Sequence, residues 1–186
     1  AAVRAVLAGQ VQSAFALVRP PGHHATRAEA MGFCLFNNIA AAASWALAEG
    51  QVSRLAIVDF DVHHGNGTAD ILWSDPRALF ISLHQYPFYP GTGHWREKGG
   101  EHSNMLNISL PPHTGDEGYA EAMDRLVLPA LWRFGPEIIL VSAGYDGHWS
   151  DPLAWMLLSI PGYRVIVDAL LRAARELCGG RLAAIL

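Results

Sequence analysis

Acidic and imidazole side chains alternate in one short segment, where Asp59, Asp61 and His63 are each two residues apart. Side chains two apart in an extended backbone share a face, so these three are expected to converge. Neighbouring carboxylates repel each other unless a proton or a cation lies between them, and carboxylate with imidazole suits zinc, iron or manganese. Asp146 is a candidate third protein ligand, and three protein ligands with one open position are typical of catalytic zinc. A lone motif of this kind more often belongs to a polar loop, so the metal interpretation depends on the accompanying clusters.

Two adjacent histidines, His23 and His24, follow an Arg-Pro-Pro-Gly run. Proline restricts the backbone of this run, which favours a positioned pair over a solvated loop pair. Such a pair can supply acid and base groups beside a metal-bound water. A site with two aspartates and one histidine is close to neutral, so its water should be less acidic than in a three-histidine zinc site. The metal then needs a general base and an extra donor for the oxyanion, and the chain offers no obvious donor.

Apolar β-rich runs alternate with helical patterns along the chain. Most strand candidates are continuous apolar runs, which is typical of strands buried on both faces of a parallel sheet. Asn37 is a candidate N-cap for the first helix after the first strand. The alternation predicts an α/β fold with a mostly parallel sheet flanked by helices. The strand candidates are Ala14 to Val18, Leu55 to Asp59, Ala78 to Leu83, Met105 to Leu110, Ile138 to Ser142 and Leu182 to Leu186, and the helix candidates are Asn38 to Glu49, Glu117 to Trp132 and Gly162 to Leu177.

The polar clusters follow four of the strand candidates. Their sequences are RPPGHH, DFDVHHGNG, SLH (82–84) and GYD (144–146). In open parallel sheets, ligands bind outside the carboxyl ends of the strands, so the four clusters predict one shared site. The long stretch from Gln85 to Ser103 fits no element and is expected to be functional or mobile.

The composition narrows the class of protein. The 186 residues are 51% hydrophobic and 16% charged, which suits one domain with a hydrophobic core. A net charge of −4 without a Lys or Arg stripe argues against direct nucleic-acid binding, and no apolar stretch reaches the roughly 18 residues of a membrane span. The two cysteines, Cys34 and Cys178, are distant, and with no secretion signal they favour a reducing, cytoplasmic compartment. Both ends carry apolar patterns, so residues 1–186 are expected to be one partial domain whose exposed apolar surface favours oligomers.

These motifs resemble the histone deacetylase and acetylpolyamine amidohydrolase family, whose fold is arginase-like. From about Phe15 to the C-terminus, RPPGHHA, GFCLFNN, VDFDVHHGNGT, SLHQYPFYPGTG and SAGYDG occur in family order, in forms most similar to class II and bacterial members. The resemblance implies a three-layer fold, a zinc ion, a structural potassium ion and removal of acetyl groups from lysine, polyamine or small-amine substrates. It further implies zinc ligands Asp61, His63 and Asp146; a catalytic pair His23 and His24, with His24 the base; Asp59 and Asn66 as the partners of that pair; potassium contacts from Asp59, Ser82 and Leu83; and tunnel walls from Gly32, Phe33 and Tyr89.

Departures from the family pattern leave alternatives open. The family's catalytic tyrosine lies in a Gly-Gly-Tyr loop just after a strand like Leu182 to Leu186, and this chain ends before such a loop. Loss of one oxyanion donor costs roughly a hundred- to thousand-fold in rate, so an inactive fragment or a non-catalytic acyl-lysine binding module is one alternative. An arginase-like manganese enzyme is another, although the order of the motifs argues against it. Trp95, Arg96 and Lys98 match no family pattern and are expected to tune substrate choice.

Overall fold

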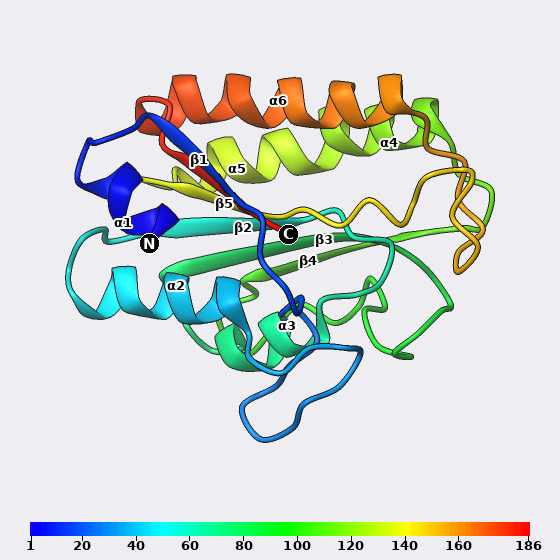
Figure 1. Ribbon diagram of the computed structural model, residues 1–186, viewed down its shortest axis with the longest axis horizontal. Helices are drawn as coiled ribbons and strands as arrows, with labels where there is room; N and C mark the ends of the chain where they lie inside the picture. Colours follow the sequence, from blue (N-terminus) through cyan, green and yellow to red (C-terminus); the bar gives the residue numbers. More distant parts are fainter.

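One sheet of six strands organises the chain, and the computed structural model describes residues 1–186. The strand order is β1-β6-β5-β2-β3-β4 (Figure 1). Every pair of neighbouring strands is parallel, which confirms the prediction of a mostly parallel sheet. The strands are β1 (Ser13–Ala16), β2 (Leu55–Asp59), β3 (Ala78–Gln85), β4 (Met105–Leu110), β5 (Ile139–Ser142) and β6 (Leu182–Ile185).

Helices cover both faces of the sheet and complete a three-layer α/β fold (Figure 1). A cluster of 29 buried residues lies on the face covered by α4, η1, α5 and α6. A second cluster, of 18 buried residues, lies under α1, α2 and α3 on the opposite face. The helices are α1 (Ala2–Leu7), α2 (Asn38–Ala48), α3 (Asn66–Leu72), α4 (Asp116–Ala122), the π-helical turn η1 (Met123–Val127), α5 (Leu128–Phe134) and α6 (Ile160–Cys178). None of these helices is both long and apolar enough to cross a membrane.

The central strand β2 and its two neighbours place the functional segments at one edge of the sheet. All five of its residues are buried, as its apolar sequence predicts. Its last residue, Asp59, pairs with Ser142 of β5 on one side and with Ser82 of β3 on the other. Because the three strands are parallel, the segments that follow them start from the same edge of the sheet.

Local sequence signals predicted some of the helices and their boundaries correctly and missed others. The Asn37 N-cap is confirmed, because its Oδ1 accepts a hydrogen bond from the Ala40 amide at 3.0 Å. The predicted helix Glu117 to Trp132 exists, but its middle turn widens into η1 and divides it into α4 and α5. Helix α3 was not predicted, because it has only seven residues and begins with Asn-Gly-Thr, three weak helix formers.

The segment between β3 and β4 contains no helix or strand, and Asn104 anchors its end. This side chain is only 5% exposed. Its Nδ2 donates to the carbonyl oxygens of Leu72, Asp75 and Ala78 at 2.9, 3.1 and 3.0 Å. Three carbonyl groups between α3 and β3 therefore depend on one amide.

We expect Asn104→Ala to lower the free energy of unfolding by about 3 kcal/mol, because a buried acceptor left without a donor costs roughly 1–3 kcal/mol. Urea denaturation measures the loss. Gln51→Ala is the matched control, since Gln51 is exposed and makes one long hydrogen bond, of 3.5 Å, to the Glu49 carbonyl. An equal loss in both variants would show that the Asn104 amide does not hold this corner.

Candidate metal centre

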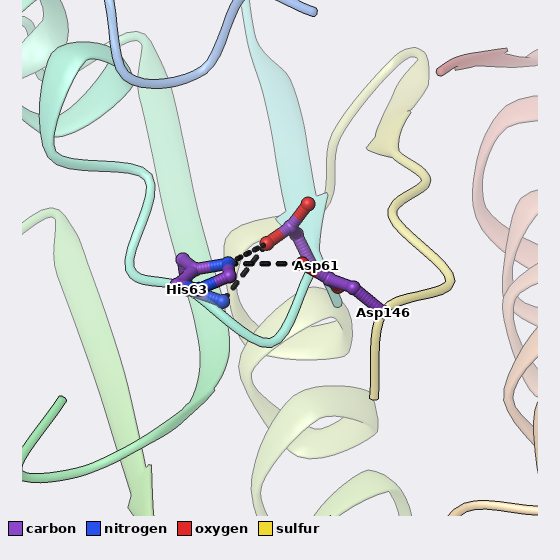
Figure 2. A group of neighbouring side chains, drawn as sticks. All are labelled: Asp61, His63 and Asp146. Carbon is purple, nitrogen blue, oxygen red and sulfur yellow. Dashed lines mark hydrogen bonds and ion pairs between the residues drawn. The ribbon is translucent and has the colours of Figure 1, made fainter. Parts of the chain in front are cut away.

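Three side chains meet where β2 and β5 end. Asp61 and His63 lie in the turn that follows β2, and Asp146 lies in the turn that follows β5. One ligand atom from each lies within 4.8 Å of the other two, and the three side chains point toward one another (Figure 2). The His63 Nδ1 is 3.1 Å from Asp61 Oδ1 and 2.9 Å from Asp146 Oδ2, so this nitrogen faces both carboxylates.

The backbone fixes both carboxylates in place. The Val62 amide donates to Asp146 Oδ1 at 2.9 Å, and the His63 amide donates to Asp61 Oδ1 at 2.8 Å. A Cβ at Gly144 would lie 2.1 Å from Asp61 Oδ2, so only glycine allows this close approach.

The way in which the ligands converge differs from the prediction. Strand β2 ends at Asp59, and residues 61–63 form a bend rather than an extended segment. The expectation that strand alternation places Asp59, Asp61 and His63 on one face is therefore wrong. The bend itself brings Asp61 and His63 together, while Asp59 lies outside the three-residue group and contacts His23 instead.

The two carboxylates of this group favour a bound cation. Burial alone would raise the pKa of Asp61, but His23 and the hydrogen bonds from His63 hold that pKa well below its ordinary value. Burial and then the Asp61 charge raise the pKa of Asp146. Burial would lower the pKa of His63, yet its hydrogen bonds to Asp146 and Asp61 raise it to about 10. A proton on His63 thus offsets only part of the charge of the two carboxylates, and a divalent ion with carboxylate and imidazole ligands fits the same position.

Metal binding is consequently expected to compete with this proton. His63 must be deprotonated to act as a ligand, and its raised pKa keeps it protonated below about pH 10. Zinc affinity should therefore rise with pH, by about tenfold per pH unit near neutrality for one released proton. Calorimetric titration in buffers of different ionisation enthalpy counts that proton. An affinity that does not change with pH would contradict the role of His63.

Two histidines with different partners lie beside the group. The His23 Nδ1 is 2.9 Å from Asp59 Oδ2, and the His24 Nδ1 is 2.7 Å from Asn66 Oδ1. The Asn66 amide oxygen can only accept, so His24 Nδ1 carries the proton and its Nε2 is the basic nitrogen. The two rings are 4.1 Å apart between centroids. Both histidines are buried, so each depends on its partner for orientation.

Burial and neighbouring charges give the two histidines opposite charge states at neutral pH. Burial disfavours the charged form of His23, but Asp61 and Asp59 outweigh it and raise its pKa to about 9. Burial and then the charge of His23 lower the pKa of His24 to about 4. His23 is therefore a cation and His24 a neutral base, an arrangement in which one histidine can accept a proton while the other provides charge.

Aromatic residues contact the histidines of the site. The Tyr89 ring lies edge-on to His24, with 5.2 Å between centroids. A Cβ at Gly32 would lie 2.2 Å from the His24 ring, and the next residue, Phe33, is 86% exposed with a φ of 65°. The sequence analysis did not identify Phe88, whose ring stacks on His63 with 5.2 Å between the ring centroids. The adjacent aromatics in the Tyr-Pro-Phe-Tyr run were the available signal, but they do not tell which ring faces the site.

The residues predicted to bind potassium lie together behind the group. Ser82 pairs with Asp59 in the β2–β3 ladder, and Leu83 is buried next to it in β3. The Ser82 hydroxyl donates to His84 Nδ1 at 2.9 Å, because His84 Nε2 donates to the Gly93 carbonyl at 2.7 Å. The hydroxyl oxygen keeps its lone pairs for another contact. Potassium binding here stays a prediction.

The fold and this site define a class, the α/β proteins that carry a carboxylate–histidine group able to hold a metal at the carboxyl ends of parallel strands. The chain belongs to the histone deacetylase domain family, whose model matches residues 1–186. This match confirms the predicted family.

Relatives agree along the whole chain. A probable deacetylase of Archaeoglobus fulgidus is 45% identical over 188 residues, which cover 100% of this chain and 52% of the relative. A histone deacetylase-like amidohydrolase of Pseudomonas aeruginosa is 46% identical and is matched over 98% of this chain and 49% of its own length. The crystal structure of the HDA15 HD domain has a TM-score of 0.91 at 41% identity and covers 100% of this chain and 54% of that one. The chain thus spans about half the length of these relatives.

Proposed function

We propose that this chain carries the zinc-dependent site of a hydrolase that removes acetyl groups from acetyl-lysine or acetylpolyamine-type substrates. The observation that supports this most is the position of His24 beside the group formed by Asp61, His63 and Asp146, with its Nδ1 hydrogen-bonded to Asn66 Oδ1 at 2.7 Å. A carboxylate-rich metal site activates water less strongly than a three-histidine site, so it requires a base of this kind.

The residues divide the chemistry between them. Zinc, when held by Asp61, His63 and Asp146, supplies a Lewis acid that polarises the acetyl carbonyl and activates water. His24 accepts the proton of the attacking water at Nε2 and returns it to the leaving amine. His23 stays protonated against Asp59 and stabilises the negative charge that develops on the acetyl oxygen.

The walls suit the proposed substrate. Tyr89 and Phe88 present aromatic surface close to His24 and His63. An acetylated amine on an alkyl stem is neutral and slender, so apolar walls can surround it without leaving a charge desolvated. The amide then meets polar groups only at its reactive end.

Acetate release from an acetyl-lysine peptide and from N-acetylputrescine tests the proposal. Protein reconstituted with zinc should release acetate, chelation should abolish the release, and added zinc should restore it. Urea formation from arginine with manganese would instead identify an arginase-type enzyme. Peptide binding without turnover would identify an acyl-lysine binding module.

A further inference from the structure

An aromatic wall leads outward from the metal group to Trp155. Phe88 stacks on His63 with an interplanar angle of 17°. The Trp155 ring lies 6.0 Å from Phe88 between centroids, within the distance at which aromatic rings interact. Trp155 is 60% exposed, so most of its ring faces solvent. Phe88 and Trp155 thus form a continuous aromatic surface from His63 outward to solvent.

The backbone of Trp155 is fixed, although its side chain is exposed. Its amide donates to Gln85 Oε1 at 3.0 Å, at the end of β3. Its carbonyl accepts from the His113 amide at 2.6 Å, in the segment after β4. A large apolar side chain held at a fixed exposed position beside a site loses little conformational entropy when it binds a ligand. Such positions are typical of binding anchors.

We infer that Trp155 is a specificity-determining residue that contacts the side chain next to the acetyl-lysine of a peptide and favours an aromatic neighbour. This inference rests on the proposed function. The wall continues beyond Phe88, and a peptide carries side chains on both sides of its lysine that reach past the entrance. A free acetylpolyamine ends in an ammonium, which an indole face can also attract, so the experiment includes such a ligand.

Calorimetric binding to the zinc-loaded protein tests the contact with three ligands. These are a peptide with Phe on both sides of acetyl-lysine, the same peptide with Gly at both positions, and N-acetylputrescine. We expect the Phe peptide to bind about three- to tenfold more tightly than the Gly peptide, which is the range of an added aromatic pair. Trp155→Ala should remove this preference, and Trp155→Phe should retain most of it.

Trp149→Ala is the matched control. Trp149 belongs to the same loop and is 63% exposed, but its ring packs against His148. The preference for Phe should persist in this variant. Equal binding of both peptides by the unaltered protein, or a preference that survives Trp155→Ala, would overturn the inference while the proposed function stands. A loss of N-acetylputrescine affinity in Trp155→Ala equal to that of the Phe peptide would overturn it in favour of ammonium recognition. Failure of all three ligands to bind would overturn both.

Discussion

Zinc affinity should fall at least about a hundredfold when Asp146 is replaced by Asn, since even residues that only support a ligand cost ten- to a hundredfold. The substitution removes the negative charge that faces His63 Nδ1 at 2.9 Å. It keeps an Oδ1 that can accept the Val62 amide, which donates at 2.9 Å to the present carboxylate, so the turn after β5 should retain its conformation. Competition titration with a chelating dye measures the affinity.

Asp168→Asn is the control for this loss of charge. Asp168 lies on the exposed side of α6 and pairs with Arg164 one turn away. The Asp168→Asn variant should bind zinc with the same affinity as the unaltered protein. If Asp146→Asn and Asp168→Asn bind zinc equally well, Asp146 is not a ligand and the group around His63 does not hold the metal.

Replacing His24 by Ala should lower the rate of acetate release about a hundred- to ten-thousandfold, the usual contribution of a general base. The zinc content should not change, because His24 lies beside the three-residue group and not within it. This combination separates a loss of proton transfer from a loss of metal. Initial rates with an acetyl-lysine peptide at saturating zinc provide the measurement.

His148→Ala serves as the control for His24→Ala. His148 is half-buried and its Nδ1 contacts the Ser150 hydroxyl at 2.8 Å, in the loop that follows Asp146. Its removal should leave the rate within about twofold, as expected for a surface change. A His24→Ala protein that keeps the full rate would show that another group accepts the proton.

The elements of the fold were predictable where a local sequence pattern alone determines the secondary structure. Apolar runs with flanking helices predicted the parallel sheet, and the run Leu55–Asp59 was predicted to the residue. Helix α3 was not predicted, because its first turn has a weak helix propensity and its stability comes from packing on β3 and α2. Strand β1 ends at Ala16, before the predicted Val18, because it lies at the edge of the sheet and pairs only with β6.

The site was predictable in its residue types but not in its geometry. Residue spacing suggested a metal, yet it assigned Asp59 to an extended face that the bend after β2 does not form. The orientations of His23 and His24 depend on partners 36 and 42 residues away, so no local pattern contains them. The same holds for Trp155, whose neighbour Phe88 follows a different strand.

Anomalous diffraction at the zinc absorption edge, from crystals grown with zinc, tests the metal centre most directly. The expected result is one peak about 2.0–2.2 Å from His63 Nδ1 and from carboxylate oxygens of Asp61 and Asp146. A peak at another set of side chains, or no peak while calorimetry shows binding in solution, would contradict the assignment of these three residues as the metal ligands.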